Sequence, residues 1–210
     1  VQYKKQSAAD WTLLAAEPYT VAVEDEDIRI RVVFEQDQSL ITTRIDDAHF
    51  PDNALRTLVK QFDTNADGSL GKEEKAAVRQ LDCSNRGITS LKGIELFREL
   101  EVLNASNNSL TTVDLSRNRA LTDIILAGNV SLTGITFPEG ITAISNNAFK
   151  GCTALKAMDI PTTVTGIGES AFEGCTGLAS VTLSDDVSTI GRAAFKNCSS
   201  LSSMSIAGAA

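Results

Sequence analysis

The twelve residues from Asp63 to Glu74, DTNADGSLGKEE, carry oxygen donors at the spacing that a calcium-binding loop requires. Side-chain donors stand at loop positions 1, 3, 5 and 12, and position 7 offers a backbone carbonyl. Glycine at position 6 permits a left-handed turn, and leucine at position 8 is suited to face a core. The loop therefore predicts a calcium site. Its predicted ligands are Asp63, Asn65, Asp67, Ser69 through its carbonyl oxygen, and Glu74.

Two short helices are predicted to hold this loop, one on each side. The entering helix is indicated by apolar residues with i, i+3, i+4, i+7 spacing and by Asp52 near its start. These apolar residues are Leu55, Leu58, Val59 and Phe62. Ala77, Val78 and Leu81 predict a short exit helix. Residues 50–80 are thus expected to form an EF-hand-like helix-loop-helix.

The second half of the chain repeats itself every 23 residues. The segments AFKGCTAL, AFEGCTGL and AFKNCSSL place Phe and Cys at equivalent positions, and each copy adds a strand with leucine-type spacing. These positions are Phe149, Phe172 and Phe195, with Cys152, Cys175 and Cys198. Such a period is typical of a solenoid, in which equivalent side chains stack. Stacked side chains point the same way, which is poor geometry for a disulfide, so we expect buried free thiols.

Upstream, a shorter form of the same pattern runs over residues 81–131, with Leu-x-x-Leu-x-Ala/Leu segments followed by asparagines. Alternate side chains of a strand face one side, so the apolar positions are expected to point inward. The asparagines are expected to turn the corners by bonding loop backbone groups. They are Asn108, Asn118 and Asn129.

Residues 132–206 resemble BspA-type leucine-rich repeats, whose copies read VTxIGxxAFxxCxxLxxVxIP, as in VTGIGESAFEGCTGLASVTL. Residues 81–129 resemble the companion repeats that such proteins carry. The resemblance implies a bacterial cell-surface or secreted protein whose role is binding rather than chemistry. It also implies a helix-loop-helix followed by repeats, the order found here. Only two of the strands keep the proline of the pattern, Pro138 and Pro161.

A single helix-loop-helix has no second EF-hand to cover it, and the first coil of a solenoid exposes an apolar end. We therefore predict a cap with structural calcium on a leucine-rich repeat solenoid that is rich in β-structure, with irregular or short helical corners. An N-terminal β-hairpin is predicted from the alternation at Val21 and Val23 and at Ile28, Ile30 and Val32. The expected segments are 1–49 (β-structure of unknown role), 50–80 (cap), 81–131 (repeats of 21–22 residues) and 132–210 (23-residue period).

Composition argues against several classes of function. A net charge of −8 and a pI near 4.7 disfavour nucleic acid as a partner. No run of about 18 apolar residues predicts a transmembrane segment. His49 is the single histidine, and neither a G-x-S-x-G nor a phosphate-loop motif occurs, so no enzyme is predicted. The chain starts at Val1 without a leader, so we expect any targeting segment to lie outside it.

The predicted function is a non-enzymatic scaffold that binds a protein or glycan of a host or neighbouring cell. The later outward-facing strand positions are small and hydroxylic, without aromatic or arginine anchors, and these favour the alternative, a stalk or spacer. The upstream strands are more varied and carry the candidate binding residues. These are Val102, Asn104, Thr112, Asp114, Asp123 and Ile125. The last strand, Leu201 to Ile206, is followed only by AGAA, so we expect the natural chain to continue with further repeats or a small tail, with an edge-to-edge dimer through this repeat as the alternative.

Overall fold

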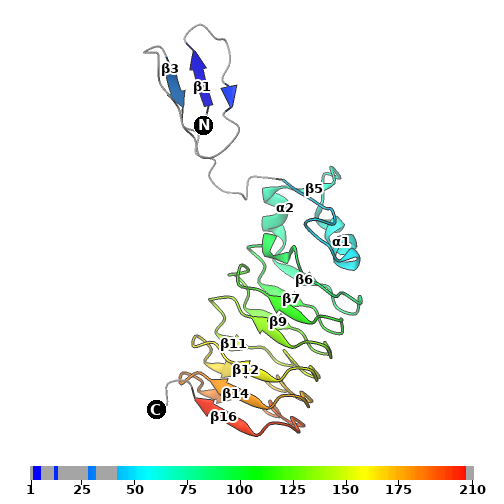
Figure 1. Cartoon of the computed structure of the whole chain (residues 1–210), viewed down its shortest axis with the longest axis vertical. Helices are drawn as coiled ribbons and strands as arrows, with labels where there is room; N and C mark the ends of the chain where they lie inside the picture. The colour runs from blue at the N-terminus through cyan, green and yellow to red at the C-terminus, as the bar shows by residue number, and fades with distance from the viewer. Residues whose placement is uncertain (1, 6–11, 14–27, 32–41, 207–210) are drawn as a thin grey trace. The chain divides into compact units, whose positions relative to one another are not determined.

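The computed structural model describes residues 2–5, 12–13, 28–31 and 42–206, and the chain forms two compact units, residues 1–41 and 42–210 (Figure 1). In the first unit, strand β1 (Gln2–Lys5) pairs antiparallel with both β2 (Thr12–Leu13) and β3 (Ile28–Arg31). Strand β3 lies where the second strand of the hairpin is expected, but it pairs with β1. Val21 and Val23 lie outside the described residues, so the hairpin stays a prediction.

The second unit begins with a helix-loop-helix. Helix α1 (Asn53–Val59) continues into the short 3-10 helix η2 (Lys60–Phe62), and helix α2 (Lys72–Ala77) follows the loop. The Asp52 carboxylate caps α1 by accepting hydrogen bonds from the backbone N–H groups of its first turn. Strand β4 (Thr43–Arg44) pairs antiparallel with β5 (Ser69–Leu70), which lies within the loop.

The exit helix is shorter than the sequence pattern indicates. Helix α2 ends at Ala77, and Val78 is buried just beyond it in an extended conformation. Leu81 lies in strand β6 (Gln80–Asp82), the first strand of the solenoid. The apolar pattern extended the helix too far because the buried positions of a strand and of a helix end are both apolar.

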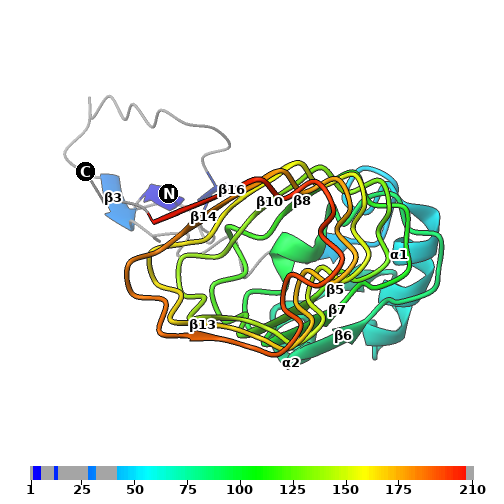
Figure 2. The same cartoon turned by 90° about the horizontal axis from the view of Figure 1, so that it is seen from below.

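The repeats wind into a solenoid whose coils contribute strands to two walls, wall A and wall B, on opposite sides (Figure 2). Wall A consists of β6, β7 (Val102–Asn104), β9 (Asp123–Ile125), β11 (Ala143–Ile144), β13 (Gly166–Ile167) and β15 (Thr189–Ile190). Wall B consists of β8 (Thr112–Asp114), β10 (Gly134–Thr136), β12 (Ala157–Asp159), β14 (Ser180–Leu183) and β16 (Ser203–Ile206). Neighbouring paired strands of the solenoid are parallel. A 3-10 helix, η3 (Ile94–Leu96), lies in the first coil.

Stacked phenylalanines form the centre of the later coils. The rings of Phe149 and Phe172 are stacked with centroids 5.2 Å apart and planes inclined by 7°. Phe172 and Phe195 are also 5.2 Å apart, with planes inclined by 1°. This spacing is close to the distance of about 4.8 Å between hydrogen-bonded strands, because each ring occupies the same place in its coil. The predicted file of phenylalanines is confirmed.

The cysteines are free thiols, as predicted. Each Sγ in the later file lies near a backbone carbonyl of the preceding coil, at 3.3 Å for Cys152 and 3.0 Å for Cys175 and Cys198. Burial raises the pKa of the Cys152 and Cys175 thiols to about 12. Cys198 is only partly buried because it lies in the last described coil.

The three predicted corner asparagines are buried and bond the backbone. Asn129 donates through Nδ2 to the carbonyls of Ala105 and Leu126, at 2.9 and 2.8 Å, and its Oδ1 accepts from Leu110 N at 3.1 Å. Asn108 and Asn118 likewise donate to buried carbonyls. The amide is suited to this place because it donates and accepts at once without carrying charge.

The hydrogen-bonded ladders are interrupted where the repeat type changes. Among the described residues, sheet β6-β7-β9 ends at β9 and sheet β11-β13-β15 begins at β11, and wall B breaks between β10 and β12. Ala143 follows Asp123 by 20 residues, whereas Gly166 follows Ala143 by 23. Coils of unequal length do not keep a common register, so the two repeat types meet without a continuous ladder.

Candidate calcium loop and binding surfaces

The predicted calcium loop is folded by its own acidic side chains. Asp63 Oδ1 accepts from Asp67 N at 3.1 Å, and Asp63 Oδ2 accepts from Gly68 N at 2.8 Å. Asn65 Oδ1 accepts from Asp67 N at 3.0 Å, and Asp67 Oδ1 accepts from Ser69 N at 2.8 Å. Gly68 has a φ of +80°, which a glycine adopts without strain. These bonds turn the donor side chains toward the inside of the loop.

Glu74 links the two ends of the loop. Its Oε1 accepts from the N–H and the hydroxyl of Thr64, at 2.7 and 2.8 Å, and its Oε2 accepts from Gly71 N at 2.8 Å. The hydrogen bond from Gly71, followed by those from Thr64, lowers the pKa of Glu74 below its ordinary value. The carboxylate is therefore held ionised at the place where the twelfth ligand is expected.

The donor chemistry of the loop suits calcium, which prefers oxygen ligands. A carboxylate has about four lone-pair sites, so Asp63, Asp67 and Glu74 keep acceptor capacity beyond the bonds just described. In the part of the chain that the structure describes, no group of three or more His, Cys, Asp or Glu side chains is gathered closely enough to hold a metal ion. Two of the five predicted ligands, Asn65 and the Ser69 carbonyl, are not His, Cys, Asp or Glu side chains and so do not count toward such a group. Calcium binding stays a prediction.

The helix-loop-helix packs against the first coil of the solenoid. The ring of Phe97 contacts two rings from the helix-loop-helix, Phe50 at 6.4 Å and Phe62 at 5.8 Å between centroids. Asp52 Oδ2 accepts from the N–H and hydroxyl of Thr89, at 2.8 and 2.9 Å, while its Oδ1 caps α1. Both apolar and polar contacts thus join α1 to the repeats.

Close packing at this contact requires glycine at position 93. Gly93 has a φ of +109°, and a Cβ atom there would lie 2.3 Å from the ring of Phe50. Phe50 and Phe97 are fully buried. The apolar end of the first coil is therefore covered by the segment that precedes it.

The six candidate binding residues are divided between the two walls. Strands β7 and β9 pair in wall A, with Val102 opposite Asp123 and Asn104 opposite Ile125. Thr112 and Asp114 lie on β8, which belongs to wall B and pairs with β10. The sequence already contains the signal for this division, because the three strands are about 10 residues apart and a complete coil takes 21 to 23.

Two of the candidate polar residues have structural roles. Asn104 Oδ1 accepts from the N–H and hydroxyl of Ser106, at 3.2 and 2.8 Å. Asp114 Oδ1 accepts from Ser116 N at 2.9 Å, and this bond lowers the pKa of Asp114. Such bonds, donated by the amide two positions on to the side chain, shape the turns after β7 and β8.

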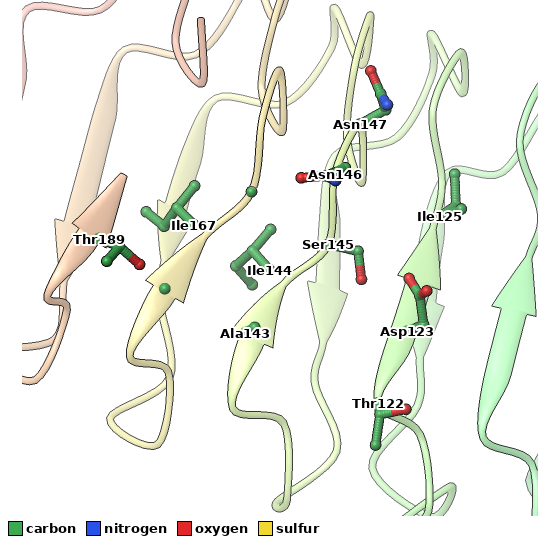
Figure 3. A pocket seen from close by; sticks show the side chains of 12 residues that line it. Thr122, Asp123, Ile125, Ala143, Ile144, Ser145, Asn146, Asn147, Ile167 and Thr189 are labelled. Atoms are coloured by element: carbon green, nitrogen blue, oxygen red, sulfur yellow. The ribbon is translucent and has the colours of Figure 1, made fainter. Parts of the chain in front are cut away.

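Asp123 differs because it begins its strand rather than ending it. Its Oδ1 is buried and accepts no hydrogen bond from the described residues. It lines a crevice of about 650 Å³ on wall A, together with Thr122, Ile125, Ala143, Ser145 and Asn146, among others (Figure 3). A second depression of about 440 Å³ lies near β8, where its lining includes Lys92, Glu95, Asp114 and Arg117.

His49 lies outside both depressions, in the turn before α1. Its Nδ1 is 2.7 Å from Asp46 Oδ1, and the side chain is exposed. The bond from His49 lowers the pKa of Asp46. This pair holds the turn and lies apart from the lining of either depression. Across the described residues, no helix is long and apolar enough to cross a bilayer.

Comparison with known proteins identifies the repeats. Residues 123–209 match the family described as "BspA type Leucine rich repeat region (6 copies)". Internalin J from Listeria monocytogenes serotype 4b is 36% identical over 70 residues, and internalin J from serovar 1/2a is 33% identical over 70 residues. Each match covers 33% of this chain. The chain spans about 8% of the length of these curated relatives.

Several solved structures are similar to this chain at low identity. A leucine rich cell surface protein from Faecalibacterium prausnitzii is 22% identical, with 62% of this chain and 32% of that chain covered and a TM-score of 0.44. Internalin C2 from Listeria monocytogenes is 23% identical, with 79% and 68% covered and a TM-score of 0.37. The functional domain of InlJ from the same species, described as including a cysteine ladder, is 15% identical, with 77% and 63% covered and a TM-score of 0.36. The repeat pattern and the two-walled solenoid show a leucine-rich repeat fold, and residues 123–209 are similar to BspA-type leucine-rich repeats.

Proposed function

We propose that this chain is a non-enzymatic interaction scaffold of a bacterial surface or secreted protein, which binds a protein or a glycan of a host or neighbouring cell. The BspA-type match and the similarity to internalin J support this reading. The observation that carries it is the solenoid itself, whose stacked rings and buried asparagines hold two walls of outward-facing side chains. A rigid wall of this kind presents a surface at little cost in entropy when a partner binds.

The alternative function is a stalk or spacer, and the later part of wall B favours it. The outward positions of β12 and β16 are exposed and small. They are Ala157, Asp159, Ser203 and Ser205. Interfaces depend mostly on aromatic and arginine anchors, which these positions lack.

The proposal includes a structural calcium ion in the helix-loop-helix. Asp63, Asn65, Asp67, the Ser69 carbonyl and Glu74 would hold it, and a bound cation would offset the negative charge of the three carboxylates in the loop. The loop connects α1 and α2, and α1 packs against the first coil through Asp52 and the ring of Phe50. An ion that stiffens the loop would thereby stabilise the cover of the solenoid end, rather than transmit a signal.

The proposal also includes an edge-to-edge dimer through the last repeat, as the alternative to a chain that continues with further repeats. Strand β16 is exposed along its whole described length, and Met204 and Ile206 are 47% and 52% exposed. An uncovered parallel strand offers unpaired backbone groups to another chain. Light scattering coupled to size exclusion tests this: a mass that rises from monomer to dimer with concentration supports the dimer, and a monomer at every concentration contradicts it.

Binding is tested by immobilising the full chain and passing host extracellular-matrix proteins and mucin glycans over it in calcium-containing buffer. We expect saturable capture of at least one component. Chain unfolded with denaturant before immobilisation serves as the control for nonspecific adsorption. Failure to bind any component above this control contradicts the scaffold proposal and supports the stalk.

A further inference from the structure

The crevice on wall A has one charged group. Twelve described residues line it, and Asp123 is the one among them with an ionisable side chain. Across the described residues, Asp123 makes no ion pair, and its Oδ1 accepts no hydrogen bond. In contrast, Asp82 and Asp114 accept a backbone N–H at the turn after their strands. No structural bond therefore accounts for a carboxylate at position 123.

The crevice crosses the place where the wall is interrupted. Strands β9 and β11 share no ladder, and Ile124 N donates instead to the side chain of Ser145, at 3.3 Å from Oγ. Figure 3 shows the side chains of Asp123 and Ser145 in the space between these two strands. The crevice thus spans this interruption and continues over β13 and β15, with the carboxylate at its β9 end.

The floor of the crevice is low and partly apolar. Ala143, Gly166 and Gly168 contribute little or no side chain of their own, and Ile125 adds a partly exposed apolar side chain to the lining. An alkyl chain that ends in a cation fits such a site, because the stem lies on apolar surface while the charged end reaches the carboxylate. The lining has no aromatic ring on which a sugar could stack.

We propose that this crevice receives an arginine or lysine side chain of a protein partner, with Asp123 as the group that binds the cation. The charges agree, since the lining carries one carboxylate and no cation and the chain has a net charge of −8. This inference rests on the proposed scaffold function and places its binding site.

The test uses the full chain, labelled with ¹⁵N, and N-acetyl-arginine amide as the probe, at about 150 mM salt to screen diffuse attraction. We expect saturable shifts of amide signals confined to residues 122–125, 143–147 and 166–168. N-acetyl-citrulline amide, which has a neutral group of the same shape, is expected to bind at least about tenfold more weakly. Lactose is the probe for the glycan alternative.

Two variants separate charge from shape. Asp123→Asn is expected to weaken binding of the arginine probe about tenfold or more, and Ala143→Leu, which fills the crevice and keeps the carboxylate, is expected to abolish it. Asp159→Asn removes an exposed carboxylate from β12 on wall B and is the matched control, with binding unchanged. Circular dichroism of each variant checks the fold.

Three results would overturn the inference: equal binding of the citrulline probe, shifts of the same residues by lactose, or unchanged binding by Asp123→Asn. The outcome is separable from that of the scaffold proposal. Capture of an extracellular protein with equal strength by the chain and by Asp123→Asn leaves the scaffold standing and removes the crevice as its site. Binding of the arginine probe without capture of any extracellular component keeps the crevice as a cation site and contradicts the scaffold proposal.

Discussion

The helix-loop-helix and the repeats close their turns by different chemistry. In the repeats, buried neutral groups bond the backbone at the corners, as Asn129 does with Ala105 and Cys175 does with Phe149, while the carboxylates of Asp82 and Asp114 bond the turns after β6 and β8. In the loop, part-exposed and exposed carboxylates do so, as Asp63 does with Gly68 and Glu74 does with Gly71. Neutral buried groups respond little to ions and pH, whereas clustered carboxylates respond to both. The repeats should therefore be stable by themselves, and the loop should depend on solution conditions.

The largest effect is expected in the repeats. Phe172→Ala removes the middle ring of the file, which contacts a ring on each side at 5.2 Å, and should lower the free energy of unfolding by about 3 to 5 kcal/mol. Urea denaturation measures it. Phe195→Ala is the matched control and should cost less, because Phe195 is only partly buried. Equal losses at the two positions would contradict the stacked core.

Calcium should separate the two regions. A concentration of 100 times Kd stabilises a protein by about 2.7 kcal/mol if the ion binds only the folded state. We expect calcium to raise the Tm of the native chain and chelator to reverse the rise. Glu74→Gln should remove this response, while Glu73→Gln, a change of its exposed neighbour, should keep it. An identical Tm with calcium and with chelator would remove calcium from the proposal. The helix-loop-helix and the repeats would then differ only in their response to pH.

The corner asparagines give a smaller effect that calcium should not alter. Asn129→Ala leaves the carbonyls of Ala105 and Leu126 without this donor inside the core, which should cost about 2 kcal/mol. Chemical denaturation with and without calcium measures the loss. Asn53→Ala, at an exposed asparagine in the first turn of α1, should change stability by less than about 0.5 kcal/mol. A loss at Asn129 that calcium restores would show that the two regions are coupled.

The smallest effect concerns an exception to the comparison, an ion pair that bridges three coils. Lys150 and Lys196 contact Glu173 at 2.8 and 3.0 Å and lower its pKa from 4.5 to about 2. Because the folded pKa is below the unfolded one, the stabilisation is fully present above pH 4.5 and is lost as the pH falls toward 2. The Tm difference between the native chain and Glu173→Gln should therefore vanish at low pH.

The control for this titration is Glu169→Gln, an exposed glutamate in the same coil. Its Tm difference from the native chain should be small at every pH. We expect the whole effect of Glu173 to be modest, since its partners are largely exposed and exposed ion pairs contribute little. A Tm difference between the native chain and Glu173→Gln that grows as the pH falls would contradict a stabilising role for the ionised Glu173.

Much of the solenoid was predictable because the same residue types recur at the same spacing in successive coils, and each recurrence predicts the same contact. The 23-residue spacing of Phe149, Phe172 and Phe195 is sufficient to place them in one file, since equivalent residues of stacked coils must coincide. The free thiols and the buried asparagines followed from the same reasoning. Helix α1 was also predictable, because its apolar spacing and its Asp52 cap agree.

The end of α2 and the division of the candidate surface were not predictable in this way. Val78 and Leu81 are apolar for reasons that a helix and a strand share, so periodicity could not separate them. Thr112 and Asp114 look like their counterparts on β7 and β9, although they lie on the other wall. The residues within one strand do not indicate to which of the two walls that strand belongs.

The sequence by itself determined the repeating coil, its buried positions and the chemistry of the loop donors, because each depends on residue type and spacing along the chain. Only the tertiary structure decided where the ladder breaks between β9 and β11, and that Asp123 Oδ1 lies beside the break without a hydrogen-bond donor among the described residues. These features depend on how coils of 20 and 23 residues stack on one another. Register between coils is a relation between distant residues, and local pattern does not contain it.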